Sequence, residues 1–151
     1  MAEAIIYVGI PGIGKSTHCK ENFFKSHVRI NRDMLRRYDF TRNVDGIHHD
    51  RKMNELITVC VENKIDIAVD NNNFTVEQRK ALIAVIREWE DSENPYTIKC
   101  IFMKPDLDKA LAQNKQRDEK EIVPDSVVKN FKNILVEPTV EEGFDSIEIV
   151  E

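Results

Sequence analysis

The sequence is poor in the features on which secreted and membrane proteins depend. It has only three cysteines, Cys19, Cys60 and Cys100, and none of them forms a Cys-x-x-Cys pair. Their odd number and wide spacing favour free thiols in a reducing compartment. No apolar run approaches the roughly 20 residues that a membrane-spanning helix needs, and the N-terminus lacks the pattern of a cleavable signal peptide. We therefore expect a cytoplasmic protein that does not enter a membrane.

An excess of positive charge is also missing, because 22 Lys and Arg residues stand against 27 Asp and Glu residues, giving a net charge of −5. Proteins that coat long nucleic acids are usually basic, since neutralisation of phosphates drives that binding. The balance argues against such coating and leaves room for binding one strand end or one small molecule. Repeats, low-complexity tracts and Gly/Pro/Ser-rich linkers are absent too. We expect one domain over residues 1–151, able to form oligomers.

Short apolar runs alternate with helical patterns along the chain, which predicts an α/β fold with a mostly parallel sheet. We expect four or five strands with helices on both faces, in three layers. The predicted strands cover residues 4–8, 28–31, 65–69, 96–103 and 146–150, the last at an edge. The predicted helices cover residues 15–24, 44–63, 106–116 and about 124–135, with a further helix after Thr75.

Local details refine two of these helices and the segment before the last one. Gln78 stands three residues after Thr75, the spacing of a capping box. The helix that follows is predicted to carry Leu82, Val85, Ile86 and Trp89 on one face. Pro124 suits the first turn of the last helix. Residues 114–122 are charged and poor in apolar side chains, so we expect them to be mobile or exposed.

The most informative motif is Gly-Ile-Pro-Gly-Ile-Gly-Lys-Ser at residues 9–16, which matches GxxxxGK[ST] in full. Glycines let the backbone approach phosphate oxygens, and the N–H groups of the loop cradle the anion at the start of a helix. The lysine can reach the β- and γ-phosphates, and the serine hydroxyl can bind magnesium. The motif therefore predicts binding of ATP with Mg²⁺. The residues expected to bind this nucleotide are Gly9, Gly12, Ile13, Gly14, Lys15, Ser16 and Thr17.

Two aspartates are expected at the same edge of the sheet. Asp33 follows the second predicted strand and Asp70 follows the third, and ligands of parallel sheets bind beyond the carboxyl ends of the strands. Phosphoryl transfer to an alcohol needs a group that orients the hydroxyl and accepts its proton. Asp33 is the candidate for this base, with a helix cap or a turn residue as the alternative. Asp70 could hold a magnesium-bound water, as Asp33 also could, or it could orient a neighbouring arginine.

Arginines are concentrated near Asp33, at positions 29, 32, 36, 37 and 42. Arg36 lies three residues after Asp33 and would share its face on a helix. It could bind a phosphate of the acceptor, although a solvated basic face is the alternative. Arg117 lies in the charged segment after the fourth strand. It could stabilise the transferring phosphoryl group from a closing loop, or it could simply be solvated.

The chain resembles the kinase domain of polynucleotide 5′-hydroxyl kinases. The resemblance rests on PGIGKST at 11–17, INRDMLR at 30–36, DNNNFTVEQR at 70–79 and NKQRDEKEIVPDSV at 114–127. It implies a P-loop kinase fold in which Lys15 and Ser16 hold the triphosphate and magnesium. Arg117 would be the lid arginine that engages the ATP phosphates, although this segment is more acidic than the family pattern.

The same resemblance implies the roles of the acceptor-side residues. Asp33 would be the general base for the 5′-hydroxyl, Arg36 would contact the 3′-phosphate of the terminal nucleotide, and Asp70 would organise this cluster. Asn71 stands where the family often has threonine. The sequence carries no phosphatase or ligase motif after these residues, as expected of a stand-alone kinase or an excised domain.

Three functions remain open at this point. The first is a polynucleotide 5′-hydroxyl kinase acting on the ends of DNA or RNA in nucleic-acid repair. The second is a P-loop kinase for a small hydroxyl compound, such as a nucleoside, a sugar, an antibiotic or a substrate like that of zeta toxins. The third is a nucleotide-binding switch, against which Asp33 argues, because a switch needs no base for an alcohol.

Overall fold

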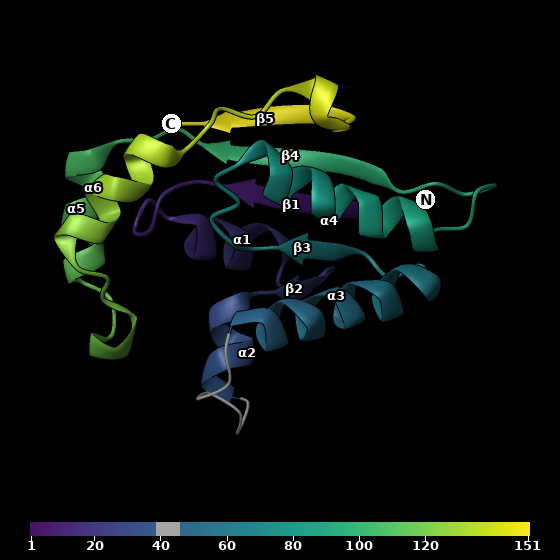
Figure 1. Ribbon diagram of the computed structural model, residues 1–151, viewed down its shortest axis with the longest axis horizontal. Helices are drawn as coiled ribbons and strands as arrows, with labels where there is room; N and C mark the ends of the chain where they lie inside the picture. Colours follow the sequence, from purple (N-terminus) through teal and green to yellow (C-terminus); the bar gives the residue numbers. More distant parts are fainter. Residues whose placement is uncertain (39–45) are drawn as a thin grey trace.

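Five parallel strands form the centre of the molecule (Figure 1). The computed structural model describes the backbone of residues 1–38 and 46–151 and the side chains of residues 1–35 and 50–151. The strand order is β2-β3-β1-β4-β5, which confirms the predicted parallel α/β sheet with the last strand at an edge. The strands are β1 (Glu3–Val8), β2 (Val28–Ile30), β3 (Ile67–Val69), β4 (Thr97–Met103) and β5 (Ser146–Val150).

Helices lie on both faces of this sheet and beyond the carboxyl ends of its strands (Figure 1). They are α1 (Lys15–Phe23), α2 (Arg32–Tyr38), α3 (Gly46–Glu62), α4 (Val76–Trp89), α5 (Leu107–Lys115) and α6 (Asp125–Ile134), with short 3-10 turns η1 (Glu119–Glu121) and η2 (Val140–Glu142). The predicted helices are thus present, although residues 44–45 of the second lie outside the described residues. Helix α2 was not predicted.

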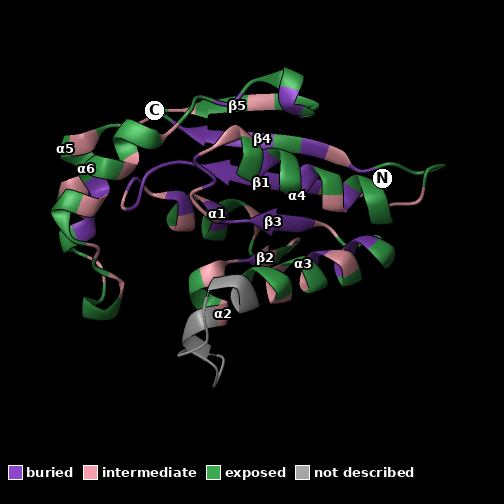
Figure 2. Ribbon diagram, viewed as in Figure 1, coloured by how far each residue is buried: buried purple, intermediate pink, exposed green. Residues whose placement is uncertain are grey.

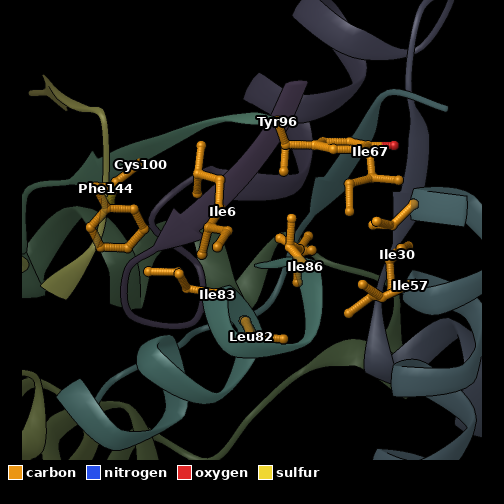
Figure 3. Close-up of a cluster of buried hydrophobic side chains, with 14 of the residues drawn as sticks. Ile6, Ile30, Ile57, Ile67, Leu82, Ile83, Ile86, Tyr96, Cys100 and Phe144 are labelled. Atoms are coloured by element: carbon orange, nitrogen blue, oxygen red, sulfur yellow. The ribbon is translucent and has the colours of Figure 1, made fainter. Parts of the chain in front are cut away.

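Side chains of β1 alternate between two hydrophobic clusters because successive residues of a strand point to opposite faces. Ala4, Ile6 and Val8 pack with α3 and α4, whereas Ile5 and Tyr7 belong to the cluster that includes α1, α5 and α6. Figure 3 shows part of the first cluster, to which Ile6 of β1 and Ile86 of α4 both contribute. Most residues of the inner strands β1, β3 and β4 are buried (Figure 2), so the sheet is the middle of three layers.

A fully buried arginine ties three distant segments together. Arg79, on α4, donates from Nε to Oε1 of Glu142 at 2.6 Å and from Nη2 to Oε2 at 3.0 Å. Its Nη1 donates to the carbonyl oxygens of Asn73, Phe74 and Val136 at 2.9–3.0 Å. The guanidinium therefore fixes the loop after β3, the segment after α6 and the turn before β5.

Helix α4 begins as predicted but buries a different set of side chains. The Thr75–Gln78 capping box is present in both directions. Leu82, Ile83 and Ile86 are buried, but Trp89 is 45% exposed. Trp89, at the end of the predicted apolar face, lies over the outer groove beside α3.

The segment between α5 and α6 is mostly exposed as predicted, with Asn114 as the exception. The side-chain amide of this fully buried residue donates to the carbonyl oxygen of Val123 at 2.5 Å and accepts from the Val123 N–H at 3.1 Å. Pro124 precedes the first turn of α6 as its N-cap instead of lying within it. In the part of the chain that the structure describes, no helix combines the length and apolar character needed to cross a bilayer.

Candidate active site

The loop between β1 and α1 has the backbone of a phosphate-binding loop. Gly12 and Gly14 adopt φ values of +84° and +110°, a region that other residues avoid. A Cβ on Gly12 would lie 2.4 Å from the carbonyl oxygen of Ala110 in α5. Ile13 is buried beneath the loop, and Gly9 donates its N–H to the carbonyl oxygen of Asn72 at 3.1 Å. The predicted loop is thus held from below by the core and from the side by α5.

Lys15 begins α1 and is almost completely buried, with 8% of its surface exposed. Its Nζ donates to the carbonyl oxygen of Ile10 at 2.8 Å, across the same loop. Burial lowers the pKa of Lys15 to about 7, the charge of Arg117 acts in the same direction, and the charges of Asp70 and Asp33 oppose it. A bound polyphosphate would give this ammonium a negatively charged partner.

Ser16, Arg29 and Asp70 form one hydrogen-bonded group beside the loop. Arg29 donates from Nε to Oδ2 of Asp70 at 2.8 Å, and its Nη2 lies 2.6 Å from the same oxygen. Nη2 also donates to the hydroxyl of Ser16 at 3.1 Å. Ser16 and Asp70 were predicted from the sequence, but Arg29 was not, because nothing in its local pattern distinguishes it from four neighbouring arginines.

Asp33 lies in the exposed first turn of α2, immediately beyond β2. The cap of this helix is Asn31, whose side-chain oxygen accepts from the N–H of Met34 at 2.9 Å. The cap interpretation of Asp33 is therefore wrong. Asn31 also donates to the carbonyl oxygen of Asp70 at 2.5 Å, so the ends of β2 and β3 are joined directly. This pairing places Asp33 at the same edge of the sheet as Asp70, beyond the carboxyl ends of β2 and β3.

The loop after β3 adds contacts that sequence analysis did not find. Asn71 accepts from the N–H of Arg32 at 2.9 Å, which gives the residue that departs from the family pattern a role in holding α2. Asn73 has a positive φ of 50° and donates to the carbonyl oxygen of Tyr7 at 2.7 Å. The run of asparagines before a helix gave a turn signal, but not these long-range partners.

Arg117 lies in the segment between α5 and α6, with Nε 4.0 Å from Oε2 of Glu121. This segment begins at Asn114 and is closed by its pair of hydrogen bonds to Val123. Thr17 is exposed on α1. Arg36 belongs to α2, but its side chain lies outside the described residues, so its contact with a phosphate stays a prediction.

A single cleft of about 2040 Å³ connects these groups. Among the described residues that line it, seven are Lys or Arg and five are Asp or Glu. The chain as a whole carries a net charge of −5, so the cleft is locally positive in an acidic protein. Such a field attracts a polyphosphate ligand. The lining residues that sequence analysis predicted are Gly12, Ile13, Gly14, Lys15, Ser16, Thr17, Asp33, Asp70 and Arg117.

The residues beside the loop fit a magnesium ion held mainly by the nucleotide. Oδ1 of Asp70 is buried and has no hydrogen-bond partner among the described residues, and a magnesium-bound water is the kind of donor that it lacks. The described residues contain no cluster of three or more His, Cys, Asp or Glu side chains able to hold a metal. Magnesium commonly keeps several waters and binds through few carboxylates together with substrate phosphates. Ser16 and Asp70 would serve it in this way.

The sequence pattern of a family described as AAA domain matches residues 5–138. This match covers most of the chain, including most of β1, the strands β2 to β4 and, among the described residues, the helices α1 to α6. The chain belongs to this family. Its parallel five-stranded sheet with flanking helices is a P-loop kinase fold.

Two curated proteins are similar at 28% identity. One is the bifunctional polynucleotide phosphatase/kinase of Schizosaccharomyces pombe, aligned over 98% of this chain and 33% of that protein. The other is the L-seryl-tRNA(Sec) kinase of Methanococcus maripaludis, aligned over 93% of this chain and 55% of that protein. The chain thus spans between a third and about half the length of these relatives. A fungal RNA kinase structure is similar with a TM-score of 0.69, at 18% identity over 100% of this chain and 75% of that one.

Proposed function

We propose that the chain is an ATP-dependent polynucleotide 5′-hydroxyl kinase that uses Mg²⁺ and acts on the ends of DNA or RNA, as in nucleic-acid end repair. The observation that carries the proposal is the cleft that contains the P-loop and Asp33 together. A P-loop alone holds a nucleotide, whereas an exposed carboxylate in the same cleft offers a base for an alcohol. The similarity to a polynucleotide phosphatase/kinase supports a strand end as the acceptor.

In the proposed reaction, Lys15 and the loop N–H groups would hold the β- and γ-phosphates, and Ser16 would hold magnesium. Asp33 accepts the proton of the 5′-hydroxyl as that oxygen attacks the γ-phosphorus, and ADP leaves. Arg117 neutralises charge on the transferring phosphoryl group from the segment above the cleft. Arg36 binds the 3′-phosphate of the terminal nucleotide, and Asp70 organises the groups between the two substrates.

The test is a panel of acceptors incubated with γ-labelled ATP and magnesium: 5′-hydroxyl DNA and RNA oligonucleotides, nucleosides, nucleoside 3′-monophosphates and sugars. We expect label on oligonucleotides and on nucleoside 3′-monophosphates, and little on bare nucleosides. Asp33→Asn should keep ATP binding and lower turnover by roughly 10²–10⁴-fold, the contribution of a general base. Asp108→Asn removes an exposed carboxylate of α5 and should leave turnover unchanged.

Arg36→Ala adds a second discrimination. It should lower kcat/KM for the oligonucleotide and the nucleoside 3′-monophosphate. The corresponding loss of transition-state stabilisation is that of a charge-assisted hydrogen bond, about 1.5–3 kcal/mol. The bare nucleoside, which has no 3′-phosphate, should be little affected. An equal loss on all three acceptors would assign Arg36 to ATP or to the fold. Label on a small hydroxyl compound alone would overturn the proposal in favour of a small-molecule kinase.

A further inference from the structure

The guanidinium of Arg29 contacts residues on both the P-loop side of the cleft and the side that carries Asp33. It reaches Oδ2 of Asp70 with two nitrogens, at 2.6 and 2.8 Å, and the hydroxyl of Ser16 at 3.1 Å. Nη1 lies 2.8 Å from the sulfur of Met34, in the helix that carries Asp33. The position of the arginine is therefore set by α1, β3 and α2 together.

This arrangement makes the two oxygens of Asp70 unequal. Oδ2 receives both guanidinium nitrogens, whereas Oδ1 is buried without a hydrogen-bond partner among the described residues. An ionised carboxylate normally uses both oxygens as acceptors, and a buried oxygen without a partner is unfavourable. Asp70 is 1% exposed, so bulk water does not resolve the imbalance. Asp70 lines the cleft, and Oδ1 is the one oxygen of its carboxylate left for a further partner there.

The number of carboxylate oxygens offered to a divalent cation affects which cation is preferred. Calcium takes six to eight oxygen ligands and accepts bidentate carboxylates, whereas magnesium is smaller and keeps several of its waters. A carboxylate with one oxygen already paired to an arginine cannot chelate a cation with both. It can accept a hydrogen bond from a water of a hydrated magnesium ion.

From this geometry we infer that Arg29 determines metal selectivity: by occupying Oδ2 of Asp70, it restricts the carboxylate to hydrogen bonding with a metal-bound water through Oδ1, which favours Mg²⁺ over Ca²⁺ beside the nucleotide. Arg29 is a positioning residue in this role, because it touches Asp70 and Ser16 rather than the reacting atoms. The inference rests on the nucleotide-binding part of the proposed function and does not depend on the acceptor.

The first experiment measures ATP binding by calorimetry with Mg²⁺, with Ca²⁺ and with EDTA, for the wild type and three variants. Arg29→Gln frees Oδ2 and should reduce the ratio of Mg²⁺-supported to Ca²⁺-supported affinity by roughly 10-fold, the scale of a lost partner of a metal-binding group. Arg29→Lys keeps a cation beside Oδ2 and should retain most of the preference. Arg32→Gln removes an adjacent arginine of the same cleft, and the ratio should match the wild type.

The second experiment does not require an Arg29 variant to fold. The relaxation of water protons by Mn²⁺ bound with ATP counts the waters that the metal retains. Asp70→Asn should leave that count unchanged, because the carboxylate is not itself bound to the metal. A gain of one water in Asp70→Asn, or an unchanged Mg²⁺/Ca²⁺ ratio in a folded Arg29→Gln, would overturn the inference. Both readouts are made without an acceptor, so failure to phosphorylate a strand end would reject the proposed function and leave this result standing.

Discussion

Gly12 of the phosphate-binding loop lies directly against Ala110 of α5: a Cβ at Gly12 would be 2.4 Å from the Ala110 carbonyl oxygen and 3.1 Å from Cβ of Asn114. The loop that is expected to hold the triphosphate is therefore packed on the helix that leads to Arg117. Two parts of the site that are about a hundred residues apart in sequence share one contact surface.

Gly12→Ala should consequently be more harmful than Gly14→Ala. Both positions have a positive φ, and a non-glycine residue there costs about 1–3 kcal/mol. Gly14 has room for a methyl group, with the nearest atoms at 3.7 and 3.8 Å, whereas Gly12 meets backbone. Thermal unfolding of the two variants should show a clearly larger loss of Tm for Gly12→Ala, and equal losses would contradict the packing.

ATP binding should take up a proton above neutral pH. Burial lowers the pKa of Lys15 to about 7, so much of the side chain is neutral above that pH in the free protein. A bound polyphosphate stabilises the ammonium and raises its pKa again. Affinity for ATP should then fall as the pH rises above about 7, by at most about 10-fold per pH unit.

This proton uptake is measurable by calorimetry of the wild type in two buffers with different ionisation enthalpies and saturating magnesium. We expect a buffer-dependent heat at pH 8 and almost none at pH 6, where Lys15 is already protonated before binding. A buffer dependence of the same size at both pH values would exclude Lys15 as the group that titrates.

Removal of Glu142 should destabilise the fold strongly. Arg79 is fully buried, and two of its nitrogens donate hydrogen bonds to the carboxylate of Glu142. Glu142→Ala leaves a buried charge without its partner, at a cost of about 3–5 kcal/mol. Glu141→Ala, at an exposed neighbouring position, should change stability by less than about 0.5 kcal/mol. Urea denaturation of both variants checks the difference.

The same pair gives stability an acid-sensitive component. Burial opposes ionisation of Glu142, but the hydrogen bonds and charge of Arg79 outweigh it and hold the pKa below the ordinary value of 4.5. This stabilisation is complete above pH 4.5 and is lost as the pH falls through the lower pKa of the folded state. The difference in unfolding free energy between wild type and Glu142→Gln should shrink on acidification below pH 4.5. A constant difference down to pH 2 would argue against it.

Asn114→Ala should loosen the segment that carries Arg117. It removes both hydrogen bonds to Val123 and leaves that residue's backbone groups short of partners, a loss of about 1–3 kcal/mol. Trypsin should cleave faster at Lys115, Arg117 or Lys120. Asn133→Ala, on the exposed side of α6, is the matched control, and equal cleavage of both variants would show that Asn114 does not hold the segment.

The sequence was sufficient to predict the elements that depend on local pattern. Apolar runs locate all five strands, and the glycine motif locates the phosphate-binding loop. The sequence was not sufficient to predict contacts between residues that lie far apart along the chain. Arg29 meets Asp70 across 41 residues, and Arg79 meets Glu142 across 63. Helix α2 escaped prediction because seven residues with a cap at Asn31 are too short to display a helical period.

The pairing of Arg79 with Glu142 also has a consequence for synthesis of the chain. Translation adds about 5–20 residues per second. Glu142 is the 63rd residue after Arg79, so it is added roughly 3–13 s later. During that interval, docking of α4 would bury a guanidinium whose carboxylate partner has not yet been made. Stable docking of α4 on this face of the sheet should therefore be delayed until Glu142 has been synthesised, which makes it a late event on the ribosome.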